Sequence, residues 1–259
     1  MSEIEDNYNK ELSRLRSSCG VFSKELNACR GKRCICSAIA ECVAYQKTIL
    51  PSGFADLEFS NFTGIVDGNR TVNSHAVKDA LSKILEYCFG DSNVSISLSR
   101  YDLHKISKMD ERFNSGHNMI IYGNSISIGK NKVGKTMLAS LIMKEAIWRR
   151  MFKDNKAYTY LFKSCPELVD DIISKRYQDQ VVNGLNADWL CIDDIFMKNR
   201  PGQSSALDQI ISVRLRQSLP TIAIIQFDPF KINNVEEIIG NHMVKILSDK
   251  ANTFVLSLS

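Results

Sequence analysis

Short apolar runs alternate with amphipathic stretches along the second half of the chain. A run such as NMIIY is typical of a buried strand, and apolar residues that recur every three or four positions are typical of a helix. The pattern predicts strands at Asn118–Tyr122, Ala157–Phe162, Trp189–Ile192, Thr221–Ile225 and Thr253–Leu258, and helices at Thr136–Phe152, Pro166–Tyr177, Ser204–Gln217 and Val235–Leu247. Because strands alternate with helices, we expect an α/β fold with a parallel sheet flanked by helices on both faces.

The first half of the chain has a different pattern. Residues 3–17 mix leucines with alternating charges, which predicts a short exposed helix. A cysteine-rich segment and an apolar helical stretch through Tyr45 follow, and Pro51-Ser52-Gly53 then interrupts the helical pattern. Residues 74–88 again carry apolar side chains at helical spacing, with Ser74 as a candidate N-cap.

Length and composition fit a large domain with a small accessory one. The chain has 259 residues, of which 44% are apolar and 24% charged, values close to those of globular proteins. We expect a partner-binding, cysteine-rich module at residues 1–50 and a larger domain at residues 51–259. The first residues are acidic and polar without a signal-peptide core, and no apolar run approaches a membrane span, so we expect a cytoplasmic protein.

The segment Gly129-Lys130-Asn131-Lys132-Val133-Gly134-Lys135-Thr136 carries the strongest chemical signal. It fits G-x-x-x-x-G-K-[ST] at every fixed position and leads directly into a predicted helix. Glycines let backbone N–H groups close around a phosphate, and the helix N-terminus adds its positive dipole end. Lys135 would contact the β/γ oxygens of ATP, and the Thr136 hydroxyl would bind Mg²⁺. Gly123 lies six positions before Gly129, so either the strand continues through Ser125–Ile128 or the loop carries an insertion.

An acidic pair ends the third predicted strand. A phosphate loop of this kind needs a carboxylate at such a strand end, and Asp193 would hold Mg²⁺ opposite Thr136. Asp194 stands where a general base could polarise the attacking water. The alternative, that both carboxylates only cap the next helix, is common for such pairs. Together the loop and the pair predict a P-loop ATPase.

The sequence resembles the DnaC/DnaI group of helicase loaders and their IstB relatives, within the AAA+ superfamily. The resemblance covers most of residues 29–259 and rests on four segments besides the phosphate loop. These are Ile49–Phe62, Asp193-Asp194, the passage Ser212–Ile222 with its arginines before Pro220-Thr221, and Ile239-Gly240-Asn241-His242. The resemblance implies an AAA+ ATPase that places a hexameric replicative helicase on single-stranded DNA and self-associates with ATP at subunit interfaces.

The chain departs from this family at two positions. The sensor at the end of the fourth strand is Gln226 instead of asparagine, and its amide could still hydrogen-bond a γ-phosphate or water. The family's arginine finger falls on His242, and a neutral imidazole cannot replace a guanidinium that stabilises transition-state charge. Either Arg214 or Arg216 takes that catalytic role, or hydrolysis is slow. Both arginines could equally lie on a solvated helix face.

Five of the eight cysteines lie between residues 19 and 42. Four thiolates around tetrahedral Zn²⁺ would give a small module the core that it cannot otherwise bury. Cys19, Cys29, Cys34 and Cys36 are the candidate ligands, and Cys34-x-Cys36 resembles the second knuckle of the zinc module in DnaI-type loaders. The alternative is a set of buried free cysteines on helices.

Nucleic-acid contacts have weaker support from the residues themselves. Lys130, Lys132, Arg149, Arg150 and Lys153 could form a basic stripe, or the last three could simply complement a helix dipole. The net charge of +4 permits a DNA partner without requiring one. An IstB-like transposition ATPase is the main rival, and a P-loop kinase is disfavoured because the tail after Asp194 is short and poor in arginine.

Overall fold

The computed structural model describes most of the chain. The described residues are 3–19, 22–23, 28–29, 35–62, 74–95, 103, 105–123, 134–153, 158–174, 186–197 and 201–258. The phosphate-loop residues Gly129–Val133, the alternative strand Ser125–Ile128 and Cys34 lie outside these ranges.

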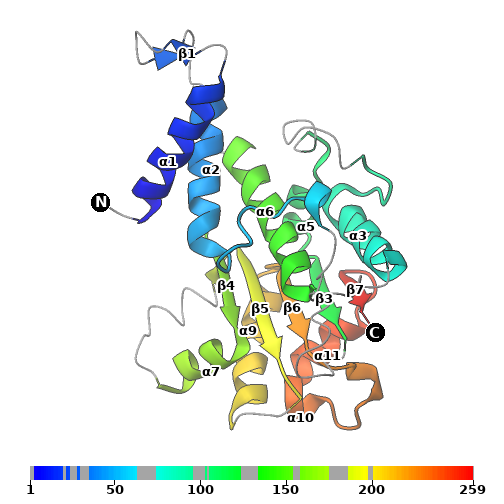
Figure 1. Ribbon diagram of the computed structural model, residues 1–259. Coiled ribbons are helices and arrows are strands. Elements are labelled where there is room, and N and C mark those ends of the chain that lie inside the picture. Colours follow the sequence, from blue (N-terminus) through cyan, green and yellow to red (C-terminus); the bar gives the residue numbers. More distant parts are fainter. Residues whose placement is uncertain are drawn as a thin grey trace.

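A five-stranded parallel sheet forms the centre of the molecule (Figure 1). Its strand order is β4-β5-β6-β3-β7, and every neighbouring pair is parallel. The bounds are β3 (Asn118–Tyr122), β4 (Tyr160–Ser164), β5 (Trp189–Ile195), β6 (Thr221–Ile225) and β7 (Thr253–Ser257). The predicted α/β fold with a parallel sheet is thus confirmed.

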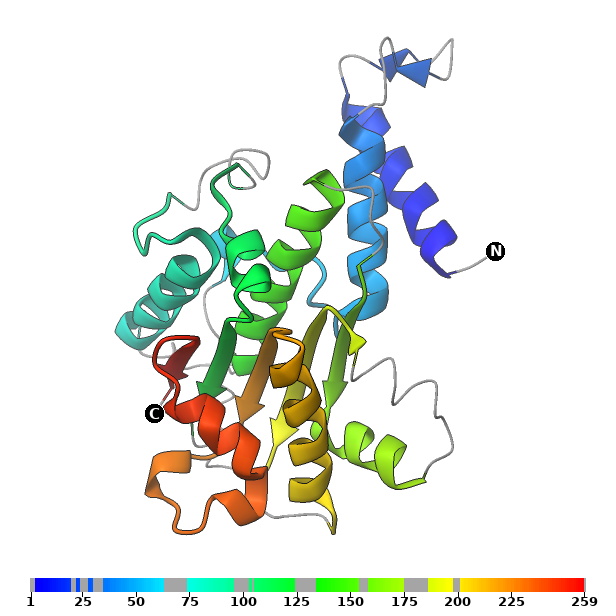
Figure 2. The ribbon, with the colours of Figure 1, turned by 180° about the vertical axis from the view of Figure 1, so that it is seen from behind.

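Two layers of helices cover the two faces of the sheet (Figures 1 and 2). One face carries α2 (Ile35–Ile49), α3 (Ser74–Phe89), α5 (Met109–Asn114) and α6 (Lys135–Lys153), and the other carries α7 (Cys165–Ser174), α9 (Gln203–Arg216), α10 (Glu236–Ile239) and α11 (Asn241–Ser248). Strand alternation feeds both layers, because Met119 and Ile121 join one apolar cluster and Ile120 joins the other. Cys88, Cys165 and Cys191 are buried, as expected of small core residues.

Helix α6 is buried along almost its whole described length. It packs against the sheet on one side and against α2, α3 and α5 on the other. Even Ser140, Lys144 and Glu145 are buried on it. The amphipathic pattern predicted this helix but not its surroundings, because the outer cover comes from segments distant in the sequence.

The helix predicted at Val235–Leu247 is two helices, α10 and α11. The break is at Gly240, whose φ of 82° lies in the left-handed region. A Cβ at this position would lie 2.6 Å from the Asp208 carboxylate and 2.9 Å from the Ser204 carbonyl. Glycine therefore lets the turn approach α9 closely, which the apolar periodicity alone did not reveal.

The N-terminal residues form a hairpin of two helices that projects from the sheet domain (Figure 1). Helix α1 (Glu3–Ser18) packs along α2, and the short strands β1 (Phe22–Ser23) and β2 (Ala28–Cys29) pair between them. The predicted exposed helix is present and most of its residues are exposed or half-buried, but Glu11 and Leu12 are buried against α2. Cys42 and Leu50 join the apolar cluster that also contains α6, while the division at residue 50 stays a prediction.

Candidate functional site

The described end of the phosphate loop sits at the carboxyl edge of the sheet. Strand β3 ends at Tyr122, and α6 begins at Lys135 directly after Gly134, whose φ is 73°. Gly123, the residue after β3, lies very close to Leu258, the residue after β7. A Cβ at position 123 would lie 2.3 Å from the Leu258 carbonyl oxygen. Glycine at position 123 therefore lets the chain leave β3 beside residue 258 and turn toward the loop.

The predicted partners Thr136 and Asp193 meet in the structure. The Thr136 hydroxyl donates a hydrogen bond of 2.7 Å to Asp193 Oδ2, across 57 residues of sequence. The contact arises because α6 begins, and β5 ends, at the same edge of the parallel sheet. A hydroxyl and a carboxylate oxygen are ligands that Mg²⁺ prefers, so these two side chains fit the expected cation.

The acidic pair has an unusual backbone. The pairing of β5 with β6 shifts register between Ile192 and Ile195, and Asp194 has a φ of 58°. Its amide donates to Asp193 Oδ1 at 2.7 Å, which orients the first carboxylate toward Thr136. A non-glycine residue in the left-handed region is uncommon and costs free energy, which is typical of functional sites.

Gln226 joins this arrangement from the strand between β3 and β5. Its side-chain Nε2 donates to Asp194 Oδ1 at 3.1 Å, and its backbone amide donates to the Ile195 carbonyl at 2.8 Å. The candidate sensor and the candidate base are therefore in direct contact. A shift of either side chain would be felt by the other.

Lys135 lies buried beside these carboxylates. Only 5% of the residue is exposed, and its ammonium donates to the Gly123 carbonyl at 3.3 Å. Burial lowers the pKa of Lys135, and the nearby charges of Asp193 and Asp194 act in the opposite direction. Burial likewise raises the pKa of Asp193, although the Thr136 hydrogen bond favours its ionised form. Burial of these charged groups costs free energy of desolvation, and a bound cation and phosphates would offset that cost.

The two candidate finger arginines have different environments. Arg214 is 1% exposed and donates to Thr221 Oγ1 (2.9 Å), to the Ala187 carbonyl (2.6 Å) and to the Pro220 carbonyl. Burial lowers the pKa of Arg214 to about 9, which leaves it charged at neutral pH. The structure therefore argues against the prediction that Arg214 is a finger, because its guanidinium binds main-chain oxygens inside the fold. Arg216 is exposed and remains the candidate.

His242 lies at the start of α11. Its backbone amide donates to Asp208 Oδ1 at 2.8 Å, and its ring Nδ1 lies 3.2 Å from the same oxygen. The side chain is about one-third exposed.

The zinc prediction has limited structural information. Cys19 is half-buried and Cys36 is buried at the start of α2, while Cys34 and the side chain of Cys29 lie outside the described residues. Within the described ranges, no group of three or more His, Cys, Asp or Glu side chains is arranged to hold a metal ion. The zinc module stays a prediction.

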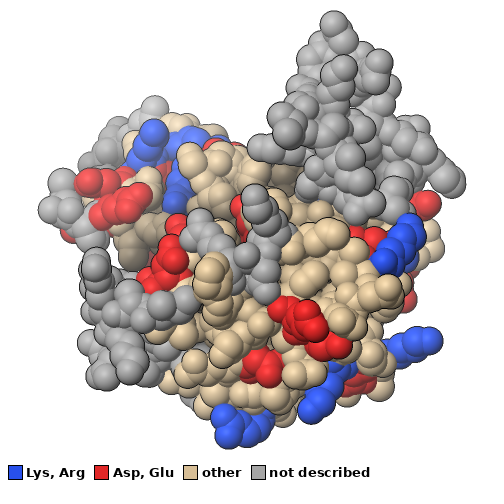
Figure 3. Space-filling model, turned by 90° about the horizontal axis from the view of Figure 1, so that it is seen from below, with Lys and Arg blue, Asp and Glu red and all other residues tan. Residues whose placement is uncertain are grey.

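The proposed basic stripe is largely outside the described side chains. Lys130 and Lys132 are not described, nor are the side chains of Arg150 and Lys153. Arg149 forms an ion pair of 2.9 Å with Asp110, which ties α6 to α5. Viewed onto the carboxyl edge, the coloured lysines and arginines lie in small groups near the rim (Figure 3). Of the described helices, none combines the length and apolarity that a membrane crossing needs.

Sequence reasoning assigned no individual role to two residues, one beside this site and one farther along α6. Phe62 lies against the last loop glycine, since a Cβ on Gly134 would be 3.5 Å from its ring. Lys144 is a buried cation in the middle of α6. A lysine at a core position of a helical pattern was the available signal for Lys144. No local pattern could have placed Phe62.

Comparisons with known proteins give similarities of fold. No protein-family model matches the sequence, and no curated protein matches it. Among solved structures, the chain is similar to DnaI, with 16% identity, a TM-score of 0.49 and coverage of 83% of this chain and 96% of that one. The DnaC helicase loader matches with 17% identity, a TM-score of 0.44 and coverage of 64% and 92%.

A third similar structure is the replication initiator DnaA bound to AMPPCP and single-stranded DNA. It matches with 14% identity and a TM-score of 0.47 over 77% of this chain, which spans about half, 49%, of that structure's length. The structural neighbours of this chain are thus DnaI, a DnaC helicase loader and a DnaA initiator, and the likeness lies in the arrangement of the chain.

Proposed function

We propose that this protein is an AAA+ ATPase that loads a hexameric replicative helicase onto single-stranded DNA. The observation that carries the nucleotide-binding part is the meeting of Lys135, Thr136 and Asp193 at one edge of the sheet. The loader part rests on the sequence resemblance at residues 49–62, 212–222 and 239–242.

The geometry suggests how the residues divide the work on ATP. Lys135 would contact the β- and γ-phosphates, and Thr136 and Asp193 would hold Mg²⁺, which neutralises the charge that develops on the phosphates. Asp194 would accept a proton from the attacking water, and its bond from Gln226 would keep the carboxylate pointed at that water. Asp193 accepts from Thr136 whereas Asp194 accepts from Gln226, so that one carboxylate would serve the cation and the other the water.

Arg216 is the proposed source of a cation for a neighbouring subunit's site. It lies on the last turn of α9 and is exposed, whereas Arg214 is buried. A mixing experiment tests this role. Arg216→Ala subunits with an intact loop are combined with Lys135→Ala subunits that keep Arg216. Recovery of ATP turnover that neither variant has alone supports the role, and no recovery argues for a slow hydrolase that acts mainly by binding.

The N-terminal hairpin is the proposed contact with the helicase, and zinc is its proposed stabilising ion. Elemental analysis of protein purified without chelator should find about one zinc per chain, as expected for four thiolates. A metal-free protein whose N-terminal cysteines all titrate freely would contradict the zinc proposal. The ATP site would stand in either case.

Loading is tested with closed circular single-stranded DNA. A ring-shaped helicase cannot thread onto a circle without opening, so its transfer requires an active loader. We expect a hexameric replicative helicase to become bound to the circle when this protein and ATP are present, and not with Lys135→Ala. Equal transfer with and without the protein would contradict loading, and selective binding of duplex DNA with a transposase would favour the IstB-like alternative.

A further inference from the structure

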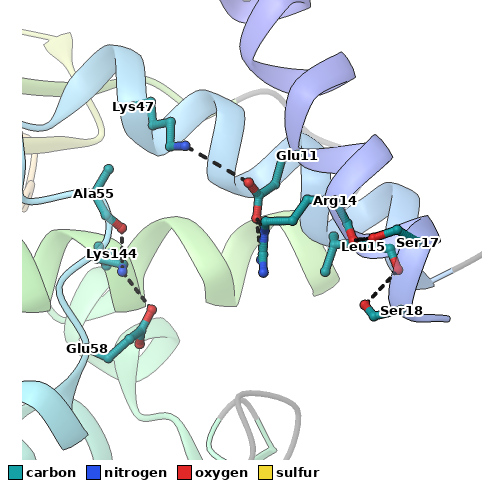
Figure 4. Close-up of polar contacts among 9 residues, drawn as sticks. All are labelled: Glu11, Arg14, Leu15, Ser17, Ser18, Lys47, Ala55, Glu58 and Lys144. Atoms are coloured by element: carbon teal, nitrogen blue, oxygen red, sulfur yellow. Dashed lines mark hydrogen bonds and ion pairs between the residues drawn. The ribbon is translucent and has the colours of Figure 1, made fainter.

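The segment before the sheet domain is held on α6 by a buried lysine. The Lys144 ammonium donates to the Ala55 carbonyl at 2.7 Å and to Glu58 Oε1 at 2.8 Å (Figure 4). It also donates to the Leu57 carbonyl. The lysine side chain is 1% exposed, whereas that of Glu58 is 37% exposed. One cation therefore binds two main-chain oxygens and one carboxylate of the same short segment.

This lysine supplies hydrogen-bond donors to main-chain oxygens of a segment outside the sheet. Ala55 and Leu57 are buried in an irregular stretch, in which the described backbone bonds are short turns such as Leu57 N to Phe54 O at 3.2 Å. Buried carbonyls need a donor, and an unsatisfied one costs about 1–3 kcal/mol. A charged donor forms stronger hydrogen bonds than a neutral one, so Lys144 fixes the path of this segment on α6.

The residues that follow the fixed segment contact the described end of the phosphate loop. It continues through the 3-10 turn η1 (Phe59–Asn61), where the Phe59 ring packs edge-on against Phe89 of α3 with centroids 5.5 Å apart. The next residue, Phe62, is 6% exposed and lies against Gly134. Lys144 lies eight residues beyond Thr136 in α6, about 12 Å along the helix axis.

The geometry points to Lys144 as a positioning residue for nucleotide binding. It holds residues 55–58 on α6, and this places the Phe62 ring against Gly134 at the end of the phosphate loop. The backbone at Gly134, where α6 begins, is then held in place for a phosphate. In an active site, a misplacement of about 1 Å can lower the reaction rate by up to about a hundredfold. A contact about 12 Å from Thr136 along α6 can likewise act on ATP binding without touching the ligand. This inference rests on the proposed nucleotide-binding function.

The test measures ATP affinity by calorimetry in the full-length chain. Lys144→Met keeps the length and apolar volume of the side chain but removes its donors, and we expect ATP affinity to fall about tenfold. Arg149→Met is the matched control. It also removes a paired cation from α6, but the partner of Arg149 is Asp110 of α5 and not the 55–58 segment. Its ATP affinity should stay within about a factor of two of wild type.

A double-mutant cycle separates positioning from general destabilisation. Phe62→Leu should also weaken ATP binding, and Lys144→Met/Phe62→Leu should lose little more than the stronger single variant, because both act through one segment. Multiplying losses, or wild-type affinity in Lys144→Met, would overturn the inference. If Lys144→Met does not fold, Glu58→Gln replaces it, because the partly exposed Glu58 side chain can be changed without unfolding the protein. We expect its ATP affinity to fall about twofold to threefold.

The outcome also distinguishes this inference from the proposed function. If wild type and Lys135→Ala bind ATP equally, the nucleotide site itself is wrong. If Lys135→Ala abolishes binding while Lys144→Met and Glu58→Gln match wild type, the site stands and the positioning role falls.

Discussion

The two edges of the central sheet each hold a buried cation, with opposite consequences. At the carboxyl edge Lys135 lies beside Asp193 and Asp194, and its hydrogen bond to the Gly123 carbonyl is long, at 3.3 Å. At the amino edge Arg214 donates to the main-chain oxygens of Ala187 and Pro220 before β5 and β6. Burial alone therefore does not distinguish a cation with a candidate functional role from a structural one. The groups that each cation contacts make the distinction.

The backbones of the two edges differ in the same sense. The carboxyl edge carries a register shift in β5 and a left-handed Asp194, a conformation that costs free energy for a residue other than glycine. The amino edge is stitched by side chains that bind backbone, such as Asn118 Oδ1 accepting from the Thr221 amide at 2.9 Å. The comparison indicates that side chains stabilise the backbone at one edge of the sheet, whereas the other edge carries the unfavourable backbone conformation beside the candidate site.

The largest expected effect is at the carboxyl edge. Lys135→Ala should abolish detectable ATP–Mg²⁺ binding and leave the fold intact, because it removes the phosphate contact together with a desolvated charge. Calorimetric titration measures binding, and circular dichroism checks the fold. Unchanged ATP affinity in a folded variant would break the comparison.

Asp194→Asn should act on turnover and spare binding. The amide keeps the size of the side chain but cannot accept a proton, so hydrolysis should slow by about 10²–10⁴-fold. Steady-state phosphate release measures the rate, and a parallel ATP titration provides the control. If Asp194→Asn hydrolyses ATP like wild type, Asp194 has no role as a base.

Arg214→Met should act on stability instead. It leaves the carbonyls of Ala187 and Pro220 without this buried donor, so the free energy of unfolding should fall by about 3 kcal/mol. Urea denaturation measures the loss, and Arg216→Met, at an exposed position, should change stability by less than about 0.5 kcal/mol. The ATP affinity of folded Arg214→Met should match wild type. A weakened affinity with undiminished stability would instead connect Arg214 to the nucleotide site.

The smallest expected effect is a pH dependence at the amino edge. Burial and the charge of Arg112 lower the pKa of His117, which precedes β3. The unfolded chain then binds more protons than the folded one, so stability should fall as the pH drops below about 6.5. Urea midpoints at neutral and mildly acidic pH should show a larger acid loss for wild type than for His117→Gln. Equal losses would show that His117 contributes nothing to the dependence.

The amino-acid sequence by itself identified the candidate residues of the site and the order of the elements around it. The phosphate-loop pattern and the Asp193-Asp194 pair can be recognised in the sequence because each consists of residues that are close together along the chain. Strands β3 and β6 have the predicted bounds. Apolar periodicity also carried the fold class, since each element must present its apolar side to one sheet.

The tertiary structure alone decided how distant residues are used. Arg214 and Arg216 look alike in sequence, yet the end of α9 turns one into the fold and the other into solvent. Gly240 divides a periodic segment because a neighbouring helix comes too close for a side chain. The contact of Lys144 with Ala55 joins residues that many others separate along the chain. Such pairings depend on which elements pack together, and a local pattern of side chains holds no information on that choice.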